Sequence, residues 1–223
     1  MRGLSVHYAI GWLLVTAALG LVAFYAPFSA MNLGSNYLIF FFHFASAITC
    51  LLFFALAGLF SIAFLGTSET VWDRAAAAAV EVGVLGCTIT MVTGSIWAKA
   101  AWNAFWVWND PRLMTVAIMW LTYLAYLSLR SSIDLPAQRS RFSAVFGIIA
   151  AINIPLVWFS IRIFNERSHP MQVDMDPEIR TTMWSCALAF LVLYAAMWRH
   201  RMAVIRLQDE AREIEERLAI RGI

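Results

Sequence analysis

The chain has 223 residues, of which 61% are hydrophobic and only 13% are charged. A soluble domain typically carries about 25% charged residues, so the composition excludes an ordinary soluble protein and indicates an integral membrane protein. The formal net charge of +2 is too small and too scattered for a nucleic-acid-binding protein. Three cysteines lie singly within apolar runs and form no CxxC pattern, which argues against a thiol-relay site: Cys50, Cys87 and Cys186.

Six apolar runs are long enough to cross the ~30 Å hydrocarbon layer of a membrane at about 1.5 Å per helical residue. Lipid offers no hydrogen-bond partner to the backbone, so each run must be a helix. We therefore expect an all-α integral membrane protein with six transmembrane helices: Tyr8–Ala26, Asn36–Leu65, Ala75–Gly94, Leu113–Arg130, Phe142–Ile161 and Thr181–Trp198. Without an A-x-A-like site before Pro27, the first run is expected to be a retained helix. Pro155 predicts a kink in the fifth run.

The rest of the chain, residues 199–223, is polar and carries charges of alternating sign. Apolar residues recur in it at three- and four-residue spacing, which predicts an amphipathic helix. We expect a membrane domain of residues 1–198, with a tryptophan-rich outer loop at residues 95–113, followed by a cytoplasmic helical tail at residues 199–223. The apolar stripe of the tail fits a protein partner or the membrane surface equally well.

The positions of Lys and Arg predict the orientation of the spans. Basic residues gather in the two tails and in the even-numbered loops, whereas the first odd loop has none. The third loop carries only Lys99 and Arg112, and the arginines of the fifth loop are mixed with acidic residues. Both termini are therefore expected in the cytoplasm and the odd-numbered loops outside.

With this orientation, two of the four histidines lie on the outer side: His43, near the outer end of the second run, and His169, in the fifth loop. Imidazole is a standard axial ligand of haem iron, and a histidine in an apolar span suggests a role. His43 could equally form a hydrogen bond to a neighbouring helix. His169 alone could be an ordinary exposed loop residue.

Residues 93–113 read TGSIWAKAAWNAFWVWNDPRL. The segment holds four of the ten tryptophans of the chain within twelve positions: Trp97, Trp102, Trp106 and Trp108. One or two tryptophans at a helix end would form an ordinary aromatic belt, and four exceed that expectation. On a short interfacial helix, Trp102, Phe105 and Trp106 would share one face.

Such a face would offer an aromatic shelf to a flat apolar macrocycle such as haem. Lys99, Arg112 and Asn109 could meet its propionates, and Asp110 could orient a ring N–H or an arginine. Composition alone supports a haem platform and a plain interfacial helix about equally.

The string TGSIW…W…WVW.DPRL resembles the tryptophan-rich WWD signature of the haem-handling proteins of cytochrome c maturation, the CcmC/CcmF/CcsA superfamily. The short six-span form resembles CcmC. The likeness continues through Glu81-Val82-Gly83 and Asn153-Ile154-Pro155, and it ends at about Trp198. The sequence departs from the pattern at Phe105, where a tryptophan is usual, and at Asn109, which is additional.

The resemblance implies that a transiently bound haem b is ligated by His43 and His169 as the two axial ligands. It also implies that the haem platform is built by the residues of the signature: Trp97, Trp102, Phe105, Trp106, Trp108, Asp110 and Arg112. The site would face the periplasm or the cell exterior from the cytoplasmic membrane. The implied partners are the haem chaperone CcmE, the ABC transporter subunits CcmA and CcmB, the single-span protein CcmD and membrane lipid.

Two other functions stay open, namely an electron-transfer subunit with a resident b-type haem and a haem-free membrane scaffold. A resident haem is usually held between histidines within the spans, whereas here one candidate ligand lies in a loop. The chain has no HExxH motif, phosphate loop or recognisable triad, so no classical enzyme activity is expected.

Overall fold

The computed structural model describes residues 2–26, 38–164 and 175–221, which form helices and no strand. Six helical segments of this part are long and apolar enough to cross a membrane, which confirms the six predicted spans. The helices are α1 (Arg2–Phe24), α2 (Ile39–Thr67), α3 (Thr70–Trp102), α4 (Pro111–Ser131), α5 (Pro136–Ala151), α6 (Asn153–Phe164) and α7 (Pro177–Arg221). Together, α5 and α6 form the fifth span.

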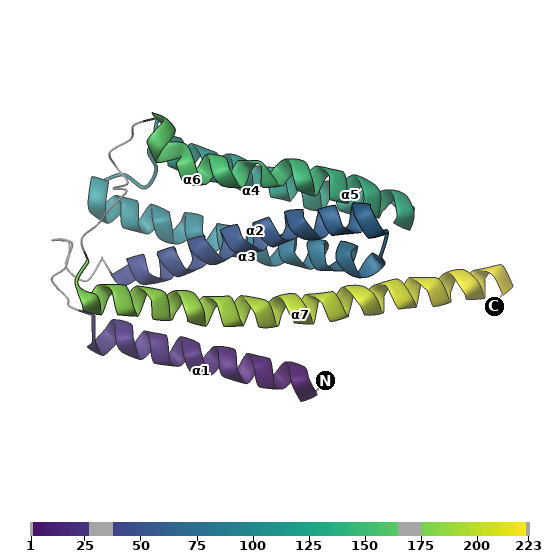
Figure 1. Cartoon of the computed structure of the whole chain (residues 1–223), viewed down its shortest axis with the longest axis horizontal. Coiled ribbons are helices and arrows are strands. Elements are labelled where there is room, and N and C mark those ends of the chain that lie inside the picture. The colour runs from purple at the N-terminus through teal and green to yellow at the C-terminus, as the bar shows by residue number, and fades with distance from the viewer. Residues whose placement is uncertain (1, 27–37, 165–174, 222–223) are drawn as a thin grey trace.

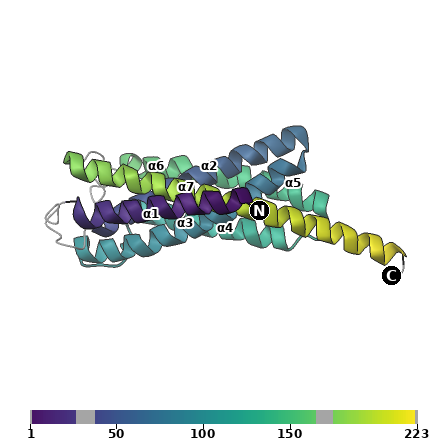
Figure 2. The same cartoon turned by 90° about the horizontal axis from the view of Figure 1, so that it is seen from below.

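The spans form three groups across the bundle, with α2 and α3 in the centre (Figure 1). Helices α4, α5 and α6 cover one side of this pair, and α7 followed by α1 covers the other. The connection between α3 and α4 lies at one end of the bundle, and the C-terminal part of α7 projects from the opposite end (Figures 1 and 2). The assignment of these ends to the two sides of the membrane stays a prediction.

Small residues on α3 allow the central helices to approach closely. The first turns of α3 bury a run of alanines, Ala75–Ala79, and the next turns bury Gly83 and Gly86. A Cβ atom at Gly83 would lie 2.6 Å from the Phe54 ring of α2, and one at Gly86 would lie 2.7 Å from the Tyr194 ring of α7. Transmembrane helices pack mainly through such close van der Waals contact, so the small residues on this face of α3 determine how closely α2 and α7 pack in the core.

The predicted kink in the fifth span is present as a break between α5 and α6. Pro155 lacks the N–H that would donate to the carbonyl of Ala151, and its ring clashes with that carbonyl. The helix accordingly ends at Ala151 and resumes at Asn153. The Asn153 amide donates to Thr122 of α4 over 3.5 Å, which ties the break to a neighbouring span.

The predicted helical tail is not separate from the sixth span, because α7 runs for 45 residues through both. Exposed pairs at i, i+4 spacing support its polar half, namely Arg206 with Glu210 at 3.5 Å and Glu213 with Arg217 at 4.0 Å. Such pairs stabilise a helix only slightly. One apolar residue of the tail packs on α3, since Ile205 is 7% exposed and contacts Ala77 and Ala78. Further along the tail, Leu207, Ile214 and Leu218 are exposed.

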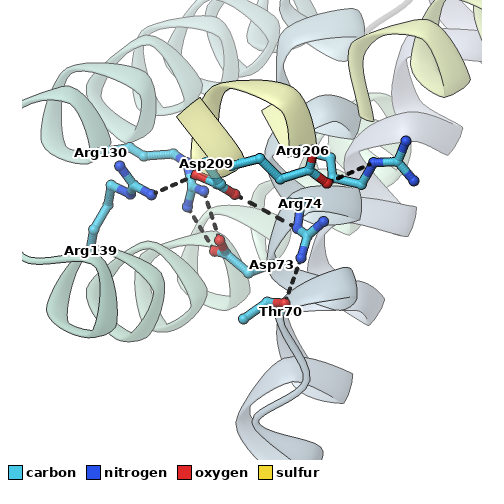
Figure 3. Close-up of polar contacts among 8 residues, drawn as sticks. Thr70, Asp73, Arg74, Arg130, Arg139, Arg206 and Asp209 are labelled. Carbon is cyan, nitrogen blue, oxygen red and sulfur yellow. Dashed lines mark hydrogen bonds and ion pairs between the residues drawn. The ribbon is translucent and has the colours of Figure 1, made fainter. Parts of the chain in front are cut away.

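A buried ion pair joins α3 to α4 at the end of the bundle from which α7 projects (Figure 3). Both Nη atoms of Arg130 donate to the two carboxylate oxygens of Asp73 over 2.7 Å each. The side chains are only 13% and 7% exposed. Two parallel charge-assisted bonds fix the relative position of the two helices.

We predict that Asp73→Asn or Arg130→Gln alone lowers the free energy of unfolding by about 3–5 kcal/mol, because each leaves one buried charge without its partner. Arg217→Gln, at a side chain that is 78% exposed, should cost less than about 1 kcal/mol. Unfolding in mixed micelles of mild detergent and sodium dodecyl sulfate measures the difference. The double variant Asp73→Asn/Arg130→Gln should recover part of the loss. Equal costs for the buried and exposed pairs would contradict the prediction.

Candidate functional site

His43 lies in the second turn of α2 and faces the C-terminal half of α3. Its Nδ1 atom is 3.1 Å from the backbone carbonyl of Thr90 and 3.3 Å from the Thr93 hydroxyl. A carbonyl oxygen has no proton to donate, so Nδ1 carries the hydrogen of the neutral imidazole. The lone pair of the ring is then on Nε2, which is the arrangement typical of a histidine that ligates a metal.

Gly94 provides the space for this imidazole. A Cβ atom at this position would lie 2.8 Å from Cε1 and 3.2 Å from Nδ1 of His43. Because Thr93 and Gly94 open the TGSIW string, the first part of the signature holds the histidine of the neighbouring helix. Trp97 follows Thr93 by one helical turn on the same face, so the histidine and the first tryptophan share one end of the bundle.

The tryptophan segment, residues 97–110, differs from the short interfacial helix that the sequence predicts, and that prediction is wrong. Helix α3 continues to Trp102 and then stops at Asn103, which has φ 58°. Asparagine tolerates this left-handed conformation, which ends a helix. The Lys99 ammonium stabilises the end by donating to the Asn103 carbonyl and side-chain oxygens over 3.1 and 2.8 Å.

The four tryptophans of the segment therefore form two pairs, one on α3 and one in the connection between α3 and α4. Trp97 and Trp102, on α3, meet edge to face with ring centroids 5.4 Å apart. Trp106 and Trp108, in the irregular connection after α3, meet at 6.2 Å. Phe105 no longer shares a helical face with Trp102, but its ring lies 5.6 Å from the Lys99 ammonium. Phe105 and Trp108 are 60% and 77% exposed, so the connection presents apolar rings outward.

Asp110 is a helix cap. Its Oδ1 atom accepts hydrogen bonds from the backbone N–H groups of Arg112 and Leu113 over 2.9 and 3.1 Å. Pro111 occupies the first helical position, where its missing N–H has no cost. The carboxylate is 2% exposed, so the acid of the signature begins α4.

Three buried donors of the segment and of the first turn of α4 have no hydrogen-bond acceptor among the described residues: Trp97 Nε1, Trp106 Nε1 and Arg112 Nε. Buried N–H groups are nearly always satisfied, so this end of the bundle has a surplus of donors. A ligand with carboxylate oxygens would supply the missing acceptors.

His169, the second predicted iron ligand, lies outside the described residues. Within the described part, no three His, Cys, Asp or Glu side chains form a metal-binding group. The structure brings His43 and the tryptophan segment to one end of α3, together with Thr90, Thr93 and Gly94. The sequence predicted no role for Thr90, and Thr93 and Gly94 entered only as part of the TGSIW string. Their signal was a pair of threonines three residues apart and a glycine, in the C-terminal part of an apolar helix.

Comparison with known proteins gives one family. The sequence model of the family described as CcmC, heme exporter protein C, matches residues 2–217. The heme exporter protein C of Bradyrhizobium diazoefficiens is 33% identical over 151 residues, which are 63% of this chain and 56% of that protein.

Two other relatives are matched over more of their length. A putative cytochrome c biosynthesis ccmC-like mitochondrial protein of Marchantia polymorpha is 32% identical over 73% of this chain and 68% of its own. The heme exporter protein C of Escherichia coli K12 is 27% identical over 85% of this chain and 79% of its own. The family match covers the spans, the tryptophan segment and most of the tail, and the chain therefore belongs to the CcmC family.

Proposed function

We propose that this protein binds haem as a cargo at the end of the bundle that carries the tryptophan segment, and presents it to a CcmE-type chaperone for cytochrome c maturation. The observation that carries the proposal is the imidazole of His43, whose Nδ1–H donates to the Thr90 carbonyl beside that segment. This hydrogen bond fixes the tautomer and the orientation of the ring, and it leaves the lone pair on Nε2, the atom that would ligate the iron. The names of the relatives, which refer to heme export and cytochrome c biosynthesis, support the same function.

In this proposal the iron of a haem b is ligated by His43 and His169. Two imidazoles fill both axial positions and leave the iron without an open site, which suits a protein that carries haem and does not activate oxygen at it. The sequence predicts His169 in the fifth loop, so in this proposal one ligand is on a span and the other on a connection.

The surplus donors support a role in binding the propionates. Arg112 and the indole N–H groups of Trp97 and Trp106 would donate to the two carboxylates, while the exposed rings of Phe105 and Trp108 would cover the apolar macrocycle. Trp102 would orient Trp97 through their edge-to-face contact. Asp110 would act indirectly, by beginning α4 so that Arg112 is held in place.

The location of the site favours delivery over electron transfer by a resident haem. His43 lies in the second turn of α2, and the tryptophan segment joins two helix ends, so the cargo would be bound at the surface of the bundle. Such a site would be open to a chaperone on the periplasmic or outer side of the cytoplasmic membrane. The implied partners are CcmE, the transporter subunits CcmA and CcmB, and CcmD.

His43→Ala tests the proposal directly. Loss of an outer-shell partner weakens metal binding by roughly 10–100-fold, and loss of the ligand itself should weaken haem binding by at least that factor. Haem titration of the purified protein, followed by the Soret band, measures the affinity, and transfer to a purified CcmE-type chaperone measures delivery. His200→Ala, at the opposite end of the bundle, is the matched control. A wild-type protein that takes up no haem would refute the proposal, and tightly held haem reduced by quinol would favour electron transfer.

Gly94→Ala tests whether the space beside Gly94 is needed to position the His43 imidazole. Alanine usually stabilises a helix by about 0.5–1 kcal/mol relative to glycine. Here the added methyl group would contact the His43 ring at 2.8 Å and displace it from the Thr90 carbonyl. We expect unchanged or higher thermal stability with at least about tenfold weaker haem binding. Gly66→Ala, where a Cβ atom meets nothing within 4 Å, should leave haem binding unchanged. Equal haem affinity in both variants would contradict this role.

Asp110 provides a third test, because a cap and a direct haem contact predict different results. Asparagine caps a helix as well as aspartate, whereas alanine costs about 1 kcal/mol. We therefore expect Asp110→Asn to keep wild-type haem affinity and thermal stability, and Asp110→Ala to lower both. Haem titration and thermal unfolding of the two variants measure these effects. If Asp110→Asn lost haem as completely as Asp110→Ala, the carboxylate charge itself would be required.

A further inference from the structure

At the end of the bundle opposite to the tryptophan segment, a cleft of about 200 Å³ opens between α3, α4, α5 and α7. Its charged lining consists of four arginines and two acids: Arg130, Arg139, Arg201, Arg212, Glu81 and Asp209. The proposed haem function uses none of these residues. The question is whether the cleft only joins the helices or also has a ligand.

The carboxylates at the cleft are already paired. Glu81 accepts from Arg201 of α7, with 2.9 Å between Oε1 and Nη2. Asp209 of α7 is shared, at 3.7 Å from Arg74 of α3 and 3.3 Å from Arg139 of α5 (Figure 3).

The lining has four arginines and two carboxylates, which leaves two positive charges in excess. The neighbouring Arg74 and Asp73, which contact Asp209 and Arg130, add one charge of each sign and leave this excess unchanged. Arg212 forms no ion pair within the described part of the chain. The cleft therefore has a positive charge that its own acids do not balance.

The hydrogen bonds show the same imbalance. The Nε atoms of Arg74 and Arg139 are buried and have no hydrogen-bond partner among the described residues. Asp209 lies 3.7 Å from Nε of Arg74 and 3.3 Å from Nη2 of Arg139, and both distances are longer than the 2.7–2.9 Å typical of a charge-assisted bond. Asp209 alone therefore cannot satisfy the arginines on either side of it. An anion with several oxygens would accept the hydrogen bonds that these arginines do not form with Asp209.

We propose that this cleft binds a phosphate group, and its position favours the headgroup of an anionic phospholipid as the source. Arginine forms bidentate bonds with phosphate, and basic pockets between the ends of transmembrane helices are suited to anionic lipid headgroups. Leu127 and Ile205 add an apolar part to the lining. Phe142, one turn after Arg139 on α5, is 57% exposed and provides a surface for an acyl chain.

Lipid binding to the purified full-length protein in neutral detergent tests the proposal, with native mass spectrometry as the readout. The probes are dioctanoyl phosphatidylglycerol, dioctanoyl phosphatidylcholine and inorganic phosphate. We expect saturable binding of the glycerol lipid, with at least about tenfold preference over the zwitterionic lipid. If inorganic phosphate competes at equal concentration, the source is a soluble phosphate; if only the anionic lipid binds, it is the membrane.

Arg212→Gln is the decisive variant, because this arginine has no ion pair to lose in the fold. It should weaken binding of phosphatidylglycerol about fivefold, the effect of one basic residue near an anionic lipid. Arg217→Gln removes the same charge from the exposed side of α7, outside the cleft, and should leave binding unchanged. Arg139→Gln should weaken binding further. Equal binding of the two lipids, or equal losses for Arg212→Gln and Arg217→Gln, would overturn the proposal.

Discussion

Close packing against one face of α3 is the constraint on which the rest of the molecule depends. The alanines at its start and the glycines at positions 83 and 86 bring the Phe54 ring of α2 and the Tyr194 ring of α7 against its backbone. In lipid, the hydrophobic effect does not drive apolar helices together, so their association depends on close van der Waals packing of complementary surfaces. Phe54 in turn stacks on Tyr123 of α4 at 3.7 Å, which extends the same packing to the other side of the bundle.

Because α3 is long, the same helix organises both ends of the protein. Its first turns carry Asp73 and Glu81, which bind arginines of α4 and α7. Its last turns carry Thr90 and Gly94, which hold His43, and then the first two tryptophans. The ion pairs fix which helices meet, and the glycine fixes how near the histidine comes. A shift of α3 along its axis would disturb both ends together.

The sequence predicted the number of spans and the break near Pro155, because lipid demands long apolar helices and proline removes a backbone donor. The lengths of α3 and α7 were not predicted. An apolar run marks only the part of a helix that lies within the hydrocarbon layer, and both helices continue past that part. The grouping of His43 with the tryptophans was predicted from sidedness.

The hydrogen bond from His43 to Thr90 was not predicted, because it depends on the rotation of two helices that single-sequence periodicity does not determine. The end of α3 was missed although Asn103 marks it. After glycine, asparagine is the residue most able to take the left-handed conformation, so Asn103 itself carried the signal. Asp110 was read through a family likeness as part of a haem platform. Its place directly before a proline identifies a helix cap by local chemistry alone.

The unbroken course of α7 gives the protein a mechanical property. At about 1.5 Å per residue, 45 helical residues make a rod of about 68 Å, more than twice the thickness of the hydrocarbon layer. No proline or glycine interrupts it between Pro177 and Arg221, so it has no built-in hinge. A sideways displacement of the projecting half would therefore tilt the whole rod about its contacts with α3. The end near Pro177 would then move in the opposite direction.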